Sequence, residues 1–133
     1  MSWFDSAVRE LRRLAGKAKG GAMFGRGNVH DLTAEEVAEG LSSGKVMLVD
    51  VREPNETAVE RFPGSVLLPL SRFDLQALPD PAGRMVVFAC AVGVRSVRAA
   101  EAAMEAGLPY DAHLAGGLKA WKSAGFPVLQ GDQ

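Results

Sequence analysis

The stretch Met85–Gly107, which reads MVVFACAVGVRSVRAAEAAMEAG, decides the fold of this chain. Its first five residues are apolar or small and rich in Val, which is typical of a strand buried on both faces. An Ala-rich segment begins at Arg95 or Ser96 and stops at the closing glycine, which predicts a helix. Only residues 91–94 separate strand from helix. We therefore expect Cys90, the single cysteine, at the carboxyl end of a strand and facing a helix N-terminus.

This position favours a reactive thiol, because the thiolate is the nucleophile and a helix N-terminus stabilises negative charge with free N–H groups. If two amides each stabilise the thiolate by about 1.5 kcal/mol, they lower the pKa of Cys90 well below its ordinary value. Arg95 acts in the same direction, whereas desolvation by Val92 and Val94 acts against it. We predict a net lowering of the pKa. The competing interpretation is a buried, unreactive cysteine.

The composition is typical of one globular domain. The chain has 133 residues, of which 47% are hydrophobic and 23% charged, which is enough for a substantial core. A net charge of −1 gives no electrostatic basis for nucleic-acid binding. One cysteine cannot form an internal disulfide, no apolar run approaches the roughly 20 residues of a membrane-spanning helix, and the N-terminus lacks a signal-peptide core. We therefore expect a cytoplasmic protein with no nucleic-acid partner.

Residues 1–27 differ from the rest of the chain in charge. They hold six basic and two acidic side chains, whereas the remainder holds 9 basic and 14 acidic ones. Apolar residues recur at helical spacing over 2–15, which predicts a basic amphipathic helix followed by a glycine-rich linker. Such a helix packs on its own domain or a second copy, or binds a partner or a membrane surface. The sequence leaves these possibilities open.

The following segments alternate between helix and strand. Thr33 with Glu36 forms a capping-box pattern that begins a helix running to about Ser42. Further expected elements are a strand at 46–51, a helix beginning at Pro54, a strand at 66–68, a helix or helical turn at 71–78, a strand at 110–114 and a helix at 118–124. The alternation predicts an α/β domain over residues 28–129, with three α/β/α layers and a mostly parallel sheet, followed by a tail at 130–133.

Other polar residues have both structural and functional interpretations. Asp50 and Arg52 end a strand, at the edge where open α/β sheets bind ligands. They could equally cap loop amides and pair with a nearby carboxylate. His30 and His113 are far apart with no third ligand in view, so we expect no metal site. His113 lies near the ligand edge of the sheet and is a candidate contact for an acceptor.

Four sequence motifs follow one another at characteristic spacing. They are Asp50-Val51-Arg52-Glu53-Pro54-x-Glu56, then Pro63-Gly64-Ser65, then Cys90-x-x-Gly93-x-Arg95-Ser96, and then Leu114-x-Gly116-Gly117-x-x-x-Trp121 with Gly125-x-Pro127-Val128. In this order they resemble a single-domain rhodanese, a sulfurtransferase, over residues 29–128. The resemblance implies a five-stranded sheet of strand order 3-2-4-5-1 with helices on both faces.

The resemblance also implies an activity. Cys90 would take a sulfane sulfur from thiosulfate or a thiol persulfide, hold it as a persulfide, and pass it to cyanide or a thiol, with no cofactor. Asp50 and Arg52 match a supporting shell at a strand end. Arg95 would hold an anionic donor or steady the loop, and Ser96 would hydrogen-bond the sulfur. The substrate-binding loop comprises Ala91, Val92, Gly93, Val94, Arg95 and Ser96.

Alternatives remain open at this level. Phosphatases and arsenate reductases of similar scaffold resemble a loop with five residues between cysteine and arginine, whereas four separate Cys90 from Arg95. A catalytically quiet regulatory or docking module is a second alternative. The apolar loop residues Ala91, Val92 and Val94 predict weak affinity for a dianionic donor and a preference for a less charged or protein-bound persulfide.

Overall fold

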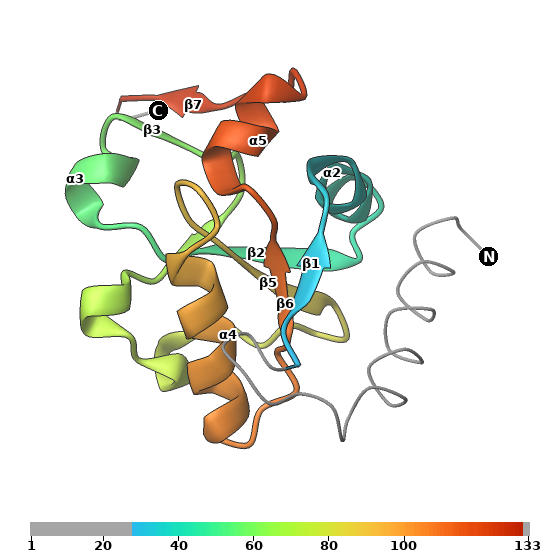
Figure 1. Cartoon of the computed structure of the whole chain (residues 1–133), viewed down its shortest axis with the longest axis vertical. Coiled ribbons are helices and arrows are strands. Elements are labelled where there is room, and N and C mark those ends of the chain that lie inside the picture. The colour runs from blue at the N-terminus through green and yellow to red at the C-terminus, as the bar shows by residue number, and fades with distance from the viewer. Residues whose placement is uncertain (1–27, 132–133) are drawn as a thin grey trace.

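A computed structural model of the chain describes residues 28–131. The predicted N-terminal helix at 2–15 lies outside these residues. The elements are β1 (His30–Leu32), α2 (Ala34–Ser42), β2 (Val46–Asp50), α3 (Pro54–Thr57), β3 (Glu60–Arg61), β4 (Val66–Leu67), β5 (Met85–Ala89), α4 (Arg95–Glu105), β6 (Ala112–Leu114), α5 (Gly117–Ser123) and β7 (Leu129–Gln130) (Figure 1).

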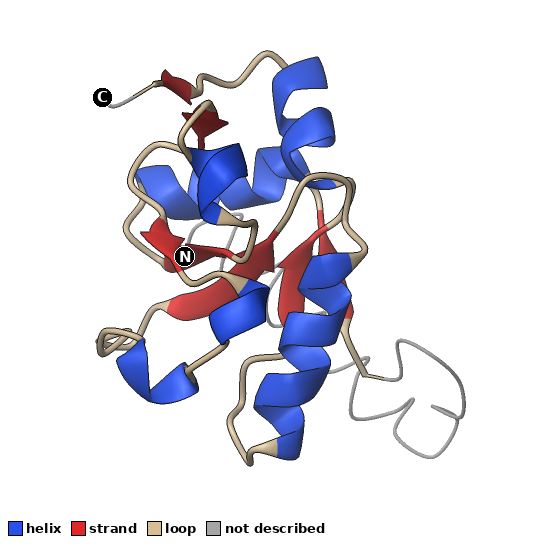
Figure 2. Cartoon of the chain, turned by 90° about the vertical axis from the view of Figure 1, so that its left-hand side faces the viewer, coloured by secondary structure: helices blue, strands red, loops and turns tan. Residues whose placement is uncertain are grey.

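Five strands form one parallel sheet in the order β1-β6-β5-β2-β4. In sequence, the strands of this sheet are β1, β2, β4, β5 and β6, which are numbered here 1 to 5. Read from β4 to β1, their order is 3-2-4-5-1, so the expected topology is confirmed. Helices α2 and α5 cover one face of the sheet and α4 covers the other, which gives the predicted three layers (Figure 2).

Side chains of the central strands alternate between two hydrophobic cores. In β5, Val87 and Ala89 face the core under α2 and α5, whereas Val86 and Phe88 face the core under α4. This follows from the two-residue period of a strand. Cys90 continues the alternation and therefore lies on the α4 side. Helix α4 packs against this side with three buried alanines, Ala99, Ala100 and Ala103.

The helix starts form as the sequence predicts. The Glu36 N–H donates to Thr33 Oγ1 at 3.1 Å, and the Thr33 N–H donates to the Glu36 carboxylate at 2.9 Å. At α3, the Glu53 N–H donates to the Glu56 carboxylate at 2.9 Å, with Pro54 at the first helical position. These bonds satisfy N–H groups that the first turn of a helix leaves without partners.

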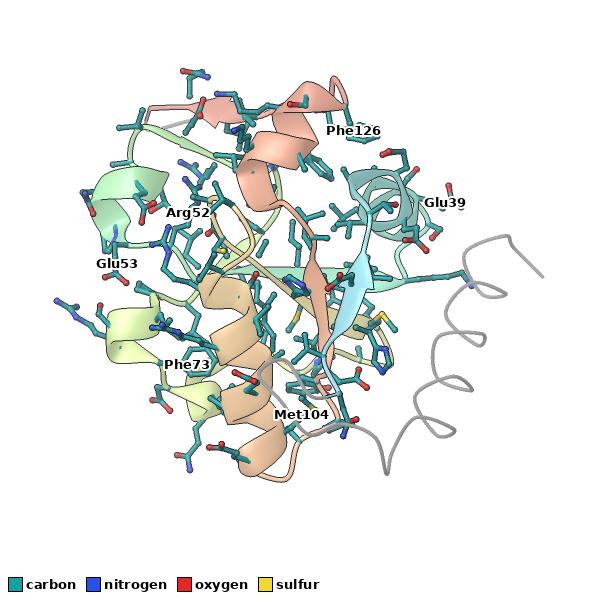
Figure 3. All side chains as sticks on the ribbon, in the orientation of Figure 1. Glu39, Arg52, Glu53, Phe73, Met104 and Phe126 are labelled. Carbon is teal, nitrogen blue, oxygen red and sulfur yellow. The ribbon has the colours of Figure 1, made fainter. Side chains whose placement is uncertain are left out.

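Two regions differ in detail from the prediction. The segment expected as a helix or helical turn at 71–78 forms two short 3-10 helices, Leu70–Arg72 and Leu75–Ala77. Between them Phe73, labelled in Figure 3, packs its ring edge on Phe88 with 5.9 Å between centroids. A second, antiparallel sheet joins β3 to β7. It carries regular structure to Gln130, past the expected domain end at 129, and its two-residue strands are too short to show a periodicity.

Candidate functional site

Backbone amides of the loop after β5 converge on the cysteine sulfur. The Gly93 N–H donates to Cys90 Sγ at 3.1 Å and the Ser96 N–H donates at 3.3 Å. Gly93 has a φ of 94°, a backbone conformation that favours glycine. An added Cβ would also lie 2.9 Å from the Gly116 nitrogen, so there is no room for a side chain. The loop is therefore an anion-holding nest that closes around one atom.

These contacts stabilise the thiolate. Burial raises the pKa of the Cys90 thiol. Hydrogen bonds from the Ser96 hydroxyl, the Ser96 amide and the amides of Gly93 and Val92 together lower it by a larger amount, so the net pKa lies below the ordinary value. The Ser96 Oγ is 3.4 Å from Sγ. The predicted direction of the shift is confirmed, and hydrogen bonding to the anion is its physical cause.

The cysteine sulfur is buried, whereas part of the loop after it is exposed. Cys90 is 1% exposed, whereas Val92 and Val94 are 56% and 61% exposed on either side of Gly93. The exposed rim of this loop is therefore apolar, formed by Val92 and Val94. The burial of the sulfur is the source of the desolvation that opposes ionisation.

Arg95 is tied to helix α3. Its guanidinium makes a two-pronged contact with the Glu56 carboxylate, at 2.6 and 2.9 Å. The hydrogen bond from Arg95 is the main cause that lowers the pKa of Glu56 to about 2. The same pairing raises the pKa of Arg95, with a smaller contribution from the charge of Cys90. Of the two roles expected for Arg95, this contact bears on steadying the loop, because it ties the start of α4 to α3 through Glu56.

Asp50 and Arg52 form a closed pair inside the fold. The Arg52 guanidinium donates to both Asp50 oxygens, the shortest contact being 2.8 Å, and also to the Glu60 carbonyl at 2.9 Å. The Arg52 N–H donates to Asp50 Oδ1 at 3.0 Å. Both residues are buried. These contacts match the structural interpretation, in which Asp50 caps a loop amide and Arg52 pairs with a carboxylate.

A buried histidine continues the hydrogen bonds that begin at the sulfur. Ser96 Oγ lies 2.8 Å from His113 Nδ1, and His113 Nε2 lies 2.7 Å from Asp31 Oδ1. His113 is 2% exposed. The sequence singled out His113 only as a candidate contact for the molecule that accepts the sulfur, and it did not indicate Asp31. A signal was available, because His113 precedes the Leu114-x-Gly116-Gly117 motif in a strand beside β5. Among residues 28–131, no cluster of three or more ligand side chains could hold a metal ion.

The start of helix α5 contacts the backbone of Cys90 and Ala91. The Leu118 N–H donates to the Cys90 carbonyl at 2.8 Å, and the Lys119 N–H donates to the Ala91 carbonyl at 3.1 Å. An added Cβ on Gly117 would lie 2.4 Å from the Cys90 carbonyl oxygen. The Gly116-Gly117 pair therefore permits contact between the α5 start and the cysteine backbone that any side chain would block.

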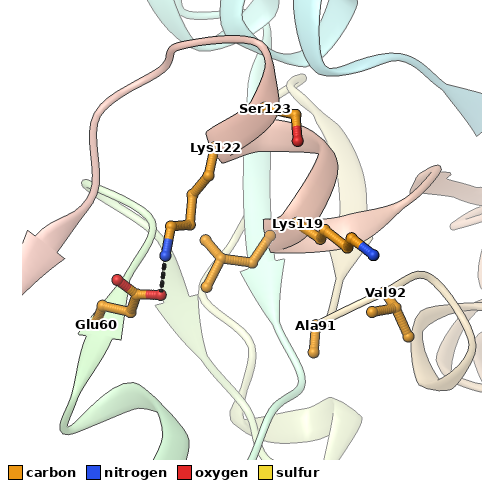
Figure 4. A pocket seen from close by; sticks show the side chains of 7 residues that line it. Glu60, Ala91, Val92, Lys119, Lys122 and Ser123 are labelled. Carbon is orange, nitrogen blue, oxygen red and sulfur yellow. Dashed lines mark hydrogen bonds and ion pairs between the residues drawn. The ribbon is translucent and has the colours of Figure 1, made fainter.

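A pocket of about 440 Å³ adjoins the loop. Figure 4 shows Ala91 and Val92 on one side and the lysines of α5 on the other. Lys122 pairs with Glu60 at 2.7 Å. Lys119, also at this pocket, makes no ion pair with residues 28–131.

In the described part of the chain, no helix is both long enough and apolar enough to cross a membrane.

Comparison with known proteins adds the family. A sulfurtransferase of Allochromatium vinosum is 31% identical over 102 residues, which cover 76% of this chain and 95% of that protein. An uncharacterized protein of Synechocystis is 42% identical over 85 residues, 64% of this chain, and the match spans about half (48%) of its length.

Among solved structures, thiosulfate sulfurtransferase of Pseudomonas aeruginosa superimposes with a TM-score of 0.68 and 26% identity, over 79% of this chain and 21% of that one. The sequence model of the rhodanese-like domain matches residues 33–124, which is most of the chain. With the nest around Cys90 and the five-stranded parallel sheet, this match makes the chain a member of the rhodanese-like domain family.

Proposed function

We propose that this protein is a sulfurtransferase that carries a sulfane sulfur as a persulfide on Cys90. The observation that carries the proposal is the convergence of the Gly93 and Ser96 amides on Cys90 Sγ. A thiolate held by preorganised N–H groups is both populated and positioned for attack on a sulfur–sulfur bond. Membership of the rhodanese-like family supports the same chemistry.

The proposed reaction has two steps. In the first, the Cys90 thiolate attacks the outer sulfur of the donor, so that an Sγ–S bond forms and the donor S–S bond breaks. Its electron pair leaves on the inner sulfur, as sulfite from thiosulfate or as a thiolate from a thiol persulfide. In the second, cyanide or an acceptor thiolate attacks the terminal sulfur and the Cys90 thiolate is restored.

We further propose that the preferred donor is a thiol persulfide bearing a carboxylate. The loop offers little positive charge to a thiosulfate dianion, because Arg95 is neutralised by Glu56 and the exposed rim is Val92 and Val94. Lys119 is at the adjoining pocket and supplies one positive charge at a distance from the sulfur, which suits a carboxylate on the body of a small thiol.

A wider oxyanion cradle for phosphate or arsenate has less support. Only four residues separate Cys90 from Arg95. The guanidinium that would bind the oxyanion in such an enzyme is occupied by Glu56 at 2.6 Å.

Intact mass spectrometry after donor treatment tests the proposal. We expect wild-type protein to gain the mass of one sulfur with glutathione persulfide, and to lose it on addition of cyanide with release of thiocyanate. Cys90→Ser protein should show neither change. Equal labelling and equal turnover by wild-type and Cys90→Ser protein contradict the proposal of a Cys90-dependent sulfurtransferase. Absence of any labelling in the wild type favours a catalytically quiet module. Thiosulfate used at the same concentration compares the two donor classes.

A further inference from the structure

A continuous line of hydrogen-bonding groups runs from the nucleophile to the edge strand of the sheet. Its members are Cys90 Sγ, Ser96 Oγ, the His113 ring and the Asp31 carboxylate, with successive separations of 3.4, 2.8 and 2.7 Å. Three of the four side chains are nearly completely buried, and only Asp31, at 49% exposure, reaches solvent. The four groups come from α4 and from three neighbouring strands or strand ends, namely β5, β6 and β1.

With Asp31 as a carboxylate, one assignment of the protons fits the contacts along this line. A carboxylate only accepts, so the His113 Nε2 must carry a proton toward Asp31. When Cys90 is a thiol, its S–H donates to Ser96 Oγ and the Ser96 O–H donates to His113 Nδ1, which leaves the ring neutral. Cys90, Ser96 and His113 then each have a hydrogen-bond partner along the line, and the buried thiol reaches Nδ1 through a single hydroxyl.

We propose that His113, held by Asp31, accepts the thiol proton of Cys90 through the Ser96 hydroxyl and so forms the reactive thiolate as an ion pair. The inference rests on the proposed function and deepens it, because it assigns the base that prepares the nucleophile of that same site. His113 acts on the thiol only through Ser96, so it is a positioning and proton-holding residue.

The transfer conserves protons and charge. The Cys90 proton moves to Ser96 Oγ while the Ser96 proton moves to His113 Nδ1. The products are a thiolate, which accepts from the Ser96 hydroxyl and two amides, and an imidazolium between Ser96 Oγ and the Asp31 carboxylate. The charge of the group is −1 before and after, and no external base enters the buried site.

The charged surroundings favour this ion pair. Asp31 faces the imidazolium from β1, and the thiolate faces it from the end of β5 across Ser96. Arg95, on the first turn of α4, interacts with the Cys90 charge while its guanidinium is paired with Glu56 of α3. The histidine ring also lies close to the loop, since an added Cβ on Gly93 would lie 3.8 Å from His113 Cε1.

The first test is a pH titration of the Cys90 thiolate by its ultraviolet absorbance, with Cys90→Ser protein as the blank. No donor and no alkylating reagent are needed, so burial of the sulfur does not affect the reading. We expect His113→Gln to raise the apparent pKa of Cys90 by about one unit, which is about a tenfold loss of thiolate below that pKa. Asp31→Asn should give a smaller rise, because the imidazole remains.

His30→Gln is the matched control. His30 also lies at the sheet edge, in β1, but it faces Asp111 at 3.7 Å and takes no part in the line from Cys90. Its replacement should leave the thiolate titration unchanged. Asp31 is the most exposed member of the line, so Asp31→Asn keeps the test decisive if His113→Gln fails to fold. Identical titrations in wild type, His113→Gln and Asp31→Asn overturn the proposal.

The second test reads the histidine itself. Linked protonation is reciprocal, so the state of Cys90 must change the state of His113. In nitrogen-15 NMR of labelled protein at neutral pH, we expect both ring nitrogens of His113 to be protonated in wild type and only Nε2 in Cys90→Ala. A purely structural histidine would show the same ring state in both proteins, and that result overturns the relay.

The two proposals fail separately. Coupled titrations without a persulfide on Cys90 remove the sulfurtransferase and leave the proton relay. A persulfide on Cys90 with uncoupled titrations removes the relay and leaves the sulfurtransferase.

Discussion

Two loops leave the same edge of the sheet and use their polar groups in opposite ways. After β2, the Asp50 carboxylate and the Arg52 guanidinium satisfy each other and a backbone carbonyl inside the fold. After β5, the amides of Gly93 and Ser96 meet at one sulfur atom. The first loop directs its charged groups at each other, whereas the second directs its amides at one sulfur atom. The position of a residue at the ligand edge of the sheet is therefore enough to make it a candidate site residue. Whether its polar groups are satisfied within its own loop then distinguishes a structural role from a chemical one.

The largest expected effect comes from breaking the closed loop. Asp50→Ala leaves the Arg52 guanidinium buried at 4% exposure without its carboxylate. We expect a loss of about 3–5 kcal/mol in the free energy of unfolding, measured by urea denaturation. The double variant Asp50→Leu with Arg52→Met is the control and should recover most of that loss. A loss below about 1 kcal/mol for Asp50→Ala contradicts the account of a buried ion pair.

A smaller effect on stability, but a larger one on the thiol, is expected from the open loop. Gly93→Ala places a side chain at a φ of 94° and close to the Gly116 nitrogen. We expect a loss of about 1–3 kcal/mol of stability from the strained backbone. The rate of alkylation of Cys90 at neutral pH should also change, because the Gly93 amide moves away from Sγ. Gly83→Ala, at a φ of 84° in an open turn, is the matched control and should alter stability without altering the thiol.

The pair that joins the Cys90 loop to α3 is expected to respond to pH. The pKa of Glu56 is lowered from 4.5 to about 2 by Arg95, so its contribution to stability is complete above pH 4.5 and is lost as pH falls toward 2. For a partly exposed pair we expect about 1–2 kcal/mol at neutral pH after allowance for solvent screening. Glu56→Gln should remove this difference between pH 7 and pH 2, whereas Glu35→Gln, an exposed carboxylate of α2, should retain it. Parallel stability curves for wild type and Glu56→Gln contradict the assignment.

The smallest effect is expected at the pocket beside the loop. Lys119→Gln should raise the KM for a carboxylate-bearing persulfide about two- to fivefold, the equivalent of about 0.5–1 kcal/mol, with kcat little changed. Lys119→Arg keeps the charge and should stay near wild type. Because thiosulfate has no separate carboxylate, its kinetics should change less. Equal changes for both donors contradict a role for Lys119 in recognising the body of the donor.

Local features of the fold could be predicted from the sequence. The strand before Cys90, the helix from Arg95 and the Thr33–Glu36 capping box all depend on residues close together in the chain. The direction of the Cys90 pKa shift was predictable for the same reason, since the amides that cause it lie within six residues of the sulfur. The resemblance to rhodaneses supplied the strand order, which local pattern does not contain.

The contacts that define the rest of the site depend on the strand order. His113 meets Asp31 across 82 residues because β6 lies beside β1, and Arg95 meets Glu56 across 39 residues because α3 lies against the loop. No periodicity or capping signal joins such pairs. The β3–β7 sheet was missed for a different reason, because two residues per strand fall below the length at which alternation is visible.

The close approach of Gly117 to the Cys90 carbonyl has a consequence for engineering. The backbone that packs behind Cys90 belongs to a segment that begins 26 residues later in the chain, so the six-residue loop does not form its own surroundings. A graft of residues 90–96 onto another scaffold needs the Gly116–Leu118 turn grafted with it. Chain cleavage between the two segments should lower reactivity at the thiol even when no atom of the loop itself is altered.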